Sequence, residues 1–485
     1  MNKSDLKPIC VFEQFARINE IPRPSKHEEK IVAYLVDFAK SHHLPVKVDK
    51  AGNVLISKPA TKGYEDRKTL ILQSHVDMVC EKLPDLDFDF QKDAIQTYVD
   101  GEWLKAKGTT LGADDGIGVA IELAVLDSND IEHGPIECLF TTDEETGLTG
   151  ADALEAGFMT GDMLINLDSE DEGQIFVSCA GGITTTAVFS FERENAPAEA
   201  AFLKVSVQGL TGGHSGDDIN KKRANAIKLL ARFLYFSQEK YGLQLSDFNA
   251  GKMHNAIPRH GHAVFAVSKE AKEKLKEDLK VFAEAVKDEF HVTEPAIQFS
   301  IEEAPAAKVL PKDVSRNFIL SMQGVYNGVL TMCQDEAIAW LVETSSNVAS
   351  VEMGEKDITV VASQRSNVMS NCTNMANTVK AVFELAGARV SQSDGYPAWK
   401  MNPNSELTKL AVEAYKNVFH KEPQVLGIHA GLECGLFSQR YPNLDMVSFG
   451  PTLRGVHSPD ERLLIPTVQM VWDHLLEMLK NTPKR

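Results

Sequence analysis

The sequence contains no long apolar segment and no leader-like start. No uninterrupted apolar run approaches the roughly 20 residues that cross a bilayer. The opening residues, Met-Asn-Lys-Ser-Asp-Leu-Lys-Pro-Ile-Cys, lack the apolar stretch of a secretory signal. We therefore expect a cytoplasmic protein with no membrane partner.

Cysteine pairs and an excess of positive charge are also missing. The seven cysteines are dispersed and form no Cys-x-x-Cys pair, so they predict reduced thiols in a cytoplasmic protein and not a disulfide framework. The formal net charge of −19 argues against a nucleic-acid partner, because such a partner requires a basic face. The 485 residues have an ordinary globular composition, and their number exceeds one ordinary core, so two or more domains are expected.

The first third of the chain alternates between strand-like and helical patterns. Strand-like runs lie at 69–72, 136–140 and 163–167, and a helix is expected from about 116 to 126. This alternation predicts an α/β domain with a central sheet flanked by helices.

The middle third predicts two small α+β lobes in succession. Its expected strands and helices are a first set at 202–207, 224–238, 263–268 and 270–290. The second set is a strand near 296–301, a helix near 336–344, a hairpin around 353–364 and a helix at 375–386.

The last part of the chain returns to the pattern of the first third, with a helix near 407–419, a short strand at 446–449 and a helix at 468–479.

Two histidines far apart in the sequence suggest how these parts connect. His457 must meet His75 in space if both bind a metal. The middle third is therefore expected to be an insertion. The prediction is a discontinuous catalytic domain of residues 1–185 and 397–485, interrupted by an inserted domain of residues 186–396.

Five acidic and imidazole side chains carry most of the functional information. Most of them follow a strand-like run, where an α/β sheet collects its active-site groups. Two imidazoles and three carboxylates match the ligands of two divalent metals that share one bridging carboxylate. The five residues are His75, Asp114, Glu145, Asp168 and His457.

Two further carboxylates lie beside this set. Asp77 is two residues beyond His75, so in a strand both share a face and Asp77 can hold the far nitrogen of the imidazole. Glu144, next to Glu145, can act as a base near a metal-bound water without being a ligand. This surplus favours a catalytic metal site over a structural one.

Each motif taken alone also has a plainer interpretation. Asp114–Asp115 fits a helix cap, Glu144–Glu145 fits a solvated turn, and His75 and Asp168 fit ordinary loop and strand-end positions. The occurrence of all these motifs in order, at element ends, favours the metal site.

The ordered motifs resemble those of the M20 metallopeptidases along essentially the whole chain. They are Ser-His-Val-Asp, Gly-Ala-Asp-Asp-Gly, Thr-Asp-Glu-Glu-Thr-Gly, Asn-Leu-Asp-Ser-Glu, Gly-Gly-His-Ser-Gly and His-Ser-Pro. Asp115-Gly116-Ile117 replaces the lysine-containing turn of many relatives, which narrows the resemblance to the dipeptidase branch. The resemblance implies a phosphorylase/hydrolase-like α/β catalytic domain with a central mixed sheet. It also implies a two-lobed α+β lid and dimerisation domain, and a homodimer formed through that lid.

The resemblance implies two divalent metal ions, with zinc expected and cobalt or manganese as alternatives. His75 and Asp168 would hold one ion, Glu145 and His457 the other, and Asp114 would bridge both.

The resemblance also implies roles for the two surplus carboxylates. Asp77 would orient the metal-bound imidazole, and Glu144 would be the general base. A cis peptide bond is implied at Asp114–Asp115.

Three more residues match substrate-handling positions of the family, and Glu433 is a fourth candidate for substrate binding. His214 corresponds to the histidine that polarises the scissile carbonyl, often supplied across a dimer. Asn255 and Arg365 match lid positions that bind substrate, and the arginine fork suits a carboxylate. Glu433 could receive the substrate ammonium. Without the resemblance, each is an ordinary loop, surface or helix-entry residue.

The predicted activity is hydrolysis of unblocked dipeptides, Xaa-His dipeptides included. If Arg365 fixes the carboxylate and Glu433 the amine, only a dipeptide spans both. An N-acyl amino acid deacylase of the same family remains an alternative. A metal-binding or peptide-binding protein with a dead site is a second one, but such a binder needs neither Glu144 nor His214.

Overall fold

The computed structural model describes residues 6–485, which form two compact units. The first unit runs to Ser178 and also contains Trp399–Gly427 and Leu432–Arg485. The second contains Cys179–Ala398 and Ile428–Gly431. In chain order the second unit thus interrupts the first, at 178/179 and 398/399, where the sequence pattern suggested 185/186 and 396/397. Ile428–Gly431, expected in the first domain, belongs to the second unit.

An eight-stranded mixed sheet forms the centre of the first unit, in the order β1-β2-β6-β3-β7-β21-β8-β20. The pairs β6–β3, β3–β7 and β7–β21 are parallel, and β2 is antiparallel to its two neighbours. Every residue of β3, β6 and β7 is buried, as in parallel strands covered on both faces. The strands are β1 (Val46–Val48), β2 (Val54–Lys58), β3 (Leu70–His75), β6 (Ile136–Thr141), β7 (Met163–Asn166), β8 (Gln174–Cys179), β20 (Gln424–Ile428) and β21 (Asp445–Ser448).

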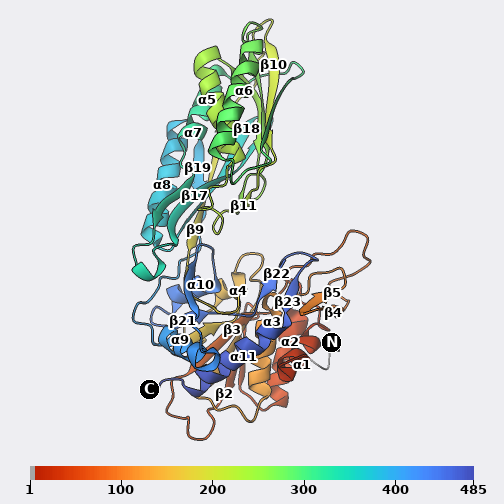
Figure 1. Cartoon of the computed structure of the whole chain (residues 1–485), viewed down its shortest axis with the longest axis vertical. Helices are drawn as coiled ribbons and strands as arrows, with labels where there is room; N and C mark the ends of the chain where they lie inside the picture. The colour runs from red at the N-terminus through yellow and green to blue at the C-terminus, as the bar shows by residue number, and fades with distance from the viewer. Residues whose placement is uncertain (1–5) are drawn as a thin grey trace. The chain divides into compact units, whose positions relative to one another are not determined.

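Helices flank this sheet, and most of them share one apolar core with it. In Figure 1 they surround the sheet of the first unit. They are α1 (Ile9–Ile18), α2 (Glu29–Ser41), α3 (Ala113–Asp127), α4 (Thr149–Ala153), α9 (Glu406–Phe419), α10 (Glu433–Arg440) and α11 (Ile465–Lys480). A smaller sheet in the same unit has the order β22-β23-β5-β4. Its strands are β4 (Thr97–Asp100), β5 (Trp103–Ala106), β22 (Leu453–Arg454) and β23 (Arg462–Leu464).

The second unit is built on one antiparallel nine-stranded sheet, β15-β10-β14-β12-β17-β18-β9-β19, with β16 also paired to β17. β12 joins β17 through Ala250 and Val351, so the two expected lobes share this sheet and one apolar core. Its strands are β9 (Gly181–Ser190), β10 (Ala201–Gln208), β12 (Gln244–Ala250), β14 (Gly261–Val267), β15 (Gln298–Glu303), β16 (Gly328–Met332), β17 (Val342–Met353), β18 (Asp357–Ser366) and β19 (Arg389–Gln392).

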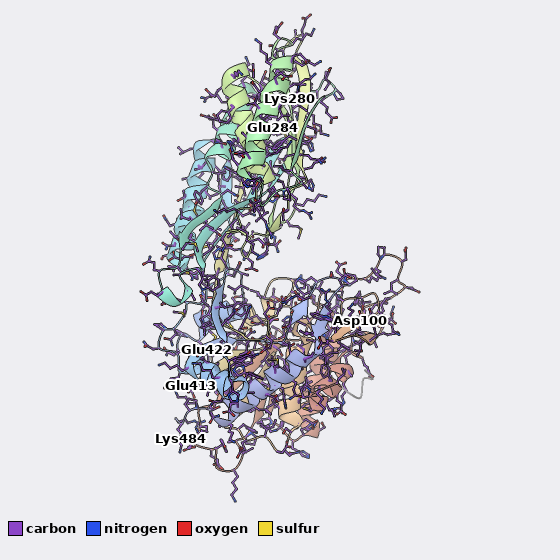
Figure 2. All side chains as sticks on the ribbon, viewed as in Figure 1. Asp100, Lys280, Glu284, Glu413, Glu422 and Lys484 are labelled. Atoms are coloured by element: carbon purple, nitrogen blue, oxygen red, sulfur yellow. The ribbon has the colours of Figure 1, made fainter. Side chains whose placement is uncertain are left out.

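Four helices pack against the sheet of the second unit, and a separate pair of short strands lies beside it. The helices are α5 (Ala226–Tyr241), α6 (Ala271–Glu289), α7 (Lys312–Gly324) and α8 (Met369–Leu385), and the short strands are β11 (Gly213–His214) and β13 (Ala256–Ile257). The outer face of α6 is charged, with Lys280 and Glu284 labelled on it in Figure 2. Across residues 6–485, no helix combines the length and apolar character needed to cross a membrane.

One expected element is wrong, and two helices, α4 and α7, were not expected. The helix near 336–344 is only a 3-10 turn at Glu336–Ile338, followed by β17. Val342 and Thr344 are β-branched and buried between paired strands, a setting that favours a strand.

Candidate metal centre

Carboxylates from three segments converge on two imidazoles in the first unit. His75, the last residue of β3, has its Nε2 3.1 Å from Asp114 Oδ1 and 3.5 Å from Asp168 Oδ1. His457 has its Nε2 3.1 Å from Asp114 Oδ2 and 3.0 Å from Glu145 Oε2. Asp114 therefore presents one oxygen to each imidazole, with a second carboxylate beside each histidine. All five expected ligands gather at this site.

The donor set suits divalent metals. One ligand atom each from His75, Asp114 and Glu145 lies within 4.8 Å of the others. Glu145 Oε1 is buried and has no hydrogen-bond partner within the described part of the chain. Imidazole nitrogens mixed with carboxylate oxygens fit zinc and also admit cobalt or manganese. The residues present therefore fit a metal centre.

Asp77 connects two of the converging segments. Its Oδ1 lies 3.4 Å from His75 Nδ1 and accepts a 3.0 Å hydrogen bond from the Glu144 amide. Its Oδ2 accepts hydrogen bonds from the Glu145 amide at 3.3 Å and from the Ser25 hydroxyl at 2.8 Å. Asp77 thus lies where it can fix both the orientation of the imidazole and the turn that carries Glu144 and Glu145.

A second group of acidic residues lies next to this turn, and its carboxylates accept hydrogen bonds within the turn. Glu28 and Asp143 lie close to Asp77. Glu28 accepts hydrogen bonds from the amides of Lys26 and Asp143, and Asp143 accepts one from the Thr146 hydroxyl. These carboxylates stabilise the turn through hydrogen bonds.

The two aspartates at the start of α3 have different surroundings. The Asp114–Asp115 peptide bond is cis, as the resemblance implied. Asp115 Oδ1 accepts a 3.2 Å hydrogen bond from the Gly118 amide, which is a helix-capping contact. The cap interpretation therefore applies to Asp115, whereas Asp114 faces the imidazoles.

Burial and neighbouring charges lower the pKa of one carboxyl group in the site and raise the pKa of another. Burial alone would raise the pKa of Asp114, but hydrogen bonds from His457 and His75 hold it well below its usual range. Burial raises the pKa of Glu144 well above its usual range, and the nearby carboxylates Asp168 and Glu145 add to this effect. A raised pKa suits a group that must accept a proton and later release it.

Glu433 lies at the start of α10 and is fully buried. Its Oε2 accepts hydrogen bonds from Gln73 Nε2 at 2.6 Å and from the Thr141 hydroxyl at 3.0 Å. Its Oε1 has no partner within residues 6–485. Burial raises the pKa of Glu433 to about 7.

The other three expected residues lie in the second unit, close to one another. Arg365 Nη2 is 3.5 Å from His214 Nε2 and donates to the Ser215 hydroxyl at 3.4 Å. Its Nη1 donates to the Tyr396 hydroxyl at 2.6 Å, and its Nε is buried with no partner in the described chain. The Asn255 carbonyl accepts a 2.8 Å hydrogen bond from the Ser215 amide. The unit therefore holds a guanidinium and an imidazole side by side.

Two buried charged residues near the metal centre were not expected from the sequence. Arg23 and Glu461 contact the backbone of the segments that carry the expected ligands. The only sequence signal was that Glu461 follows His457 by four residues. Nothing in the sequence around Arg23 distinguishes it from a surface arginine.

Known proteins resemble this chain over its whole length. The chain is 42% identical over 483 residues to the cytosol non-specific dipeptidase of Escherichia coli, covering 99% of each protein. It is 43% identical to the aminoacylhistidine dipeptidase of Vibrio alginolyticus, whose crystal structure matches with a TM-score of 0.91 over 100% of this chain and 99% of that one. A tripeptidase structure from Staphylococcus aureus matches at 16% identity with a TM-score of 0.57 over 98% of both chains, which shows a shared fold. The pattern of peptidase family M20/M25/M40 matches residues 71–481. With that match and these long alignments, the chain belongs to the M20/M25/M40 family of peptidases.

Proposed function

We propose that the chain is a metal-dependent dipeptidase that hydrolyses unblocked dipeptides, Xaa-His dipeptides included. The observation that carries this proposal is the position of Asp114, whose two oxygens each lie 3.1 Å from a different imidazole. Relatives more than 40% identical over nearly the whole chain are named as dipeptidases, one of them for aminoacylhistidine substrates. The peptide-bond hydrolase activity rests on this family membership.

Two divalent ions are proposed to share the site. His75 and Asp168 would hold one, Glu145 and His457 the other, and Asp114 would bridge them. Zinc is the expected metal, and cobalt and manganese suit the same donors. When bound, such ions supply an activated water at neutral pH and polarise the scissile carbonyl.

Glu144 is proposed as the general base. It takes the proton of the attacking water and delivers it to the leaving amine, so that the amine departs neutral. Asp77 holds the Glu144 amide, and this contact supports a fixed position for the carboxylate. Asp77 also orients His75 for metal binding.

Four residues are proposed to recognise the dipeptide. Arg365 would bind the substrate carboxylate through its guanidinium, which suits a planar anion. His214 would donate to the carbonyl oxygen as negative charge develops, an effect worth about 3–4 kcal/mol in comparable sites. Asn255 would contact the substrate. Glu433, with one buried oxygen lacking a partner among the described residues, would receive the ammonium.

The N-acyl amino acid deacylase is the weaker candidate. The relatives that match along the whole chain carry dipeptidase names. A deacylase also has no use for an ammonium receptor. Glu433, by contrast, places a buried carboxylate against Gln73 of β3 and Thr141 of β6.

A homodimer formed through the second unit is also proposed. β16 pairs only with β17 among the described strands, so its other edge is open. Leu330, Met332 and Trp340 in and near this strand are 44%, 41% and 51% exposed. An open edge with exposed apolar residues is a surface that a second chain can cover.

A cytoplasmic location completes the proposal and accords with the "cytosol" in the relative's name.

The function is tested on metal-stripped protein reloaded with zinc, cobalt or manganese. We expect stripping to abolish cleavage of free dipeptides and at least one metal to restore it. Tripeptides should be poor substrates because their two charged ends are too far apart. N-acetylated dipeptides should be poor substrates because they lack the ammonium group. Equal cleavage of a dipeptide and its N-acetylated form would support the deacylase. A protein that binds metals but cleaves neither substrate would be a dead-site binder.

A further inference from the structure

Four consecutive backbone amides point at one buried carboxylate beside the metal centre. Glu461 is 2% exposed. Its Oε2 accepts hydrogen bonds from the amides of Leu111 and Gly112 at 2.7 and 3.0 Å. Its Oε1 accepts hydrogen bonds from the amides of Ala113 and Asp114 at 2.8 and 3.3 Å. The turn that ends in the shared carboxylate is therefore folded around Glu461.

A buried guanidinium, that of Arg23, also donates hydrogen bonds to the backbone of the same turn. Arg23 is 1% exposed, and its Nη1 donates to the carbonyls of Val76 and Asp77 at 3.0 and 3.1 Å. Its Nη2 donates to the Gly112 carbonyl. Arg23 thus ties the segment that follows His75 to the turn that precedes Asp114.

Gly112 is held between these two charged groups. Its N–H donates to Glu461 and its carbonyl accepts from Arg23. Its φ of +66° is left-handed, and a Cβ there would lie 2.6 Å from Arg23 Nη2 and 2.9 Å from Met78 Sδ. Only glycine therefore fits the turn while Arg23 occupies its place.

Glu461 also connects the turn to the second histidine. It lies in the same connection between β22 and β23 as His457, four residues further on. Its carboxylate anchors that connection to the backbone at Asp114. Three ligand-bearing segments, those of His75, Asp114 and His457, are thus joined through two side chains that are not ligands.

We propose that Arg23 and Glu461 are positioning residues that hold Asp114 between His75 and His457 and so set the affinity of the metal centre. Both act through backbone groups, and a buried turn needs such partners for N–H and C=O groups that no strand or helix satisfies. Because they fix the ligands before any metal arrives, they reduce the ordering that metal binding must impose. This inference rests on the proposed metal-dependent function.

The test is metal affinity in Glu461→Gln and Arg23→Met proteins. Metal-free protein is titrated with cobalt and followed by visible absorption, and zinc affinity is measured against a chromophoric chelator. We expect binding about 10- to 100-fold weaker than in the unchanged protein, the usual effect of removing a partner behind the ligands. The Gln side chain has the shape of Glu, but its NH2 group is a donor that would face two of the backbone N–H donors. It therefore cannot replace the carboxylate. Arg23→Lys keeps the charge and should recover part of the affinity.

Glu137→Gln is the matched control for a purely structural effect. Glu137 is a buried carboxylate of the same unit and accepts hydrogen bonds from the amides of Thr160 and Gly161 at 2.8 and 3.1 Å. This variant should lose stability without losing metal affinity. If Glu461→Gln does not fold, Arg23→Met decides. Affinities within about twofold of the unchanged protein in folded Glu461→Gln and Arg23→Met proteins would overturn the inference. Absence of metal binding by the unchanged protein would instead overturn the proposed function.

Discussion

Glu144 and Glu145 are adjacent in sequence but have different partners. Glu145 Oε2 lies 3.0 Å from His457 Nε2, at the expected position of a ligand. Burial among Asp168, Glu145 and Glu433 raises the pKa of Glu144. Asp77 holds both amides, so one turn can present one carboxylate to the metals and keep the other for proton transfer.

This division of roles predicts the effect of Glu144→Gln. The substitution keeps the size of the side chain but removes its ability to accept a proton. We expect kcat to fall about 100- to 10,000-fold, the usual contribution of a general base. Metal content, measured by elemental analysis, should stay at the level of the unchanged protein because Glu144 is not a proposed ligand. Near-normal turnover in the metal-loaded variant would refute the role.

At the residue scale, the sequence pointed to groups that are proposed to act through their own chemistry. His75 and Asp168 could be predicted because a strand-like run delivers each to the edge of a sheet. Arg23 and Glu461 could not, because they contact backbone atoms, and any buried arginine or glutamate with such contacts looks ordinary in a sequence. The cis bond at Asp114–Asp115 was anticipated only through the family resemblance.

At the scale of elements, buried parallel strands were the most predictable. β3, β6 and β7 agree with the expected runs because each is a short apolar stretch bounded by polar turns. The segment near 336–344 was misread because its apolar residues fit a helical period, whereas sheet pairing decides the structure of β17. α7 carried a usable signal, since Phe318 and Met322 are buried at a spacing of four residues.

The contact between α9 and α11 predicts that the folded protein loses stability in acid. His474 on α11 donates from Nε2 to the Ala411 carbonyl at 2.8 Å, and its ring lies against Phe449 and Tyr415. Burial lowers the pKa of His474 from 6.5 to about 4. The unfolded chain therefore binds a proton that the folded chain rejects between these values. The free energy of unfolding should decrease as the pH falls from 6.5 to 4, by about 3 kcal/mol for this group.

The measurement compares denaturant unfolding of the unchanged protein and His474→Gln between pH 4 and 7. Glutamine can place its amide nitrogen near the Ala411 carbonyl but has no proton to gain in this range. We expect a shallower decrease of unfolding free energy with acid in the variant, even if its stability at pH 7 is lower. Parallel curves for the two proteins would contradict this origin of the sensitivity.

At the scale of the whole molecule, the predicted domain order depended on one assumption about two distant residues. If residues 75 and 457 meet at one metal site, the chain between the two predicted catalytic parts must be an insertion. Their approach to the same Asp114 carboxylate agrees with that reasoning. The shared sheet of the second unit could not be predicted, because it depends on the pairing of β12 with β17 over a long separation in the chain.

The proposed homodimer leads to a prediction about His214. If the family role applies and His214 serves the catalytic centre of the partner, two inactive variants should complement each other. In a heterodimer of Glu144→Gln and His214→Ala, the chain that keeps Glu144 would receive an intact His214 from the other chain. We expect about half of the activity of the unchanged dimer, because one of the two symmetric sites is complete. The heterodimer is obtained by co-expression with two affinity tags and assayed after tandem purification.

The control uses the open edge of β16 to separate complementation from contamination. Leu330→Lys places a charge on the exposed strand edge and should favour monomers, as measured by light scattering after gel filtration. When both inactive chains also carry Leu330→Lys, the rescue should disappear. Activity near zero in the stable heterodimer would mean that His214 serves its own chain. A Leu330→Lys protein that remains dimeric would place the interface on another surface of the second unit.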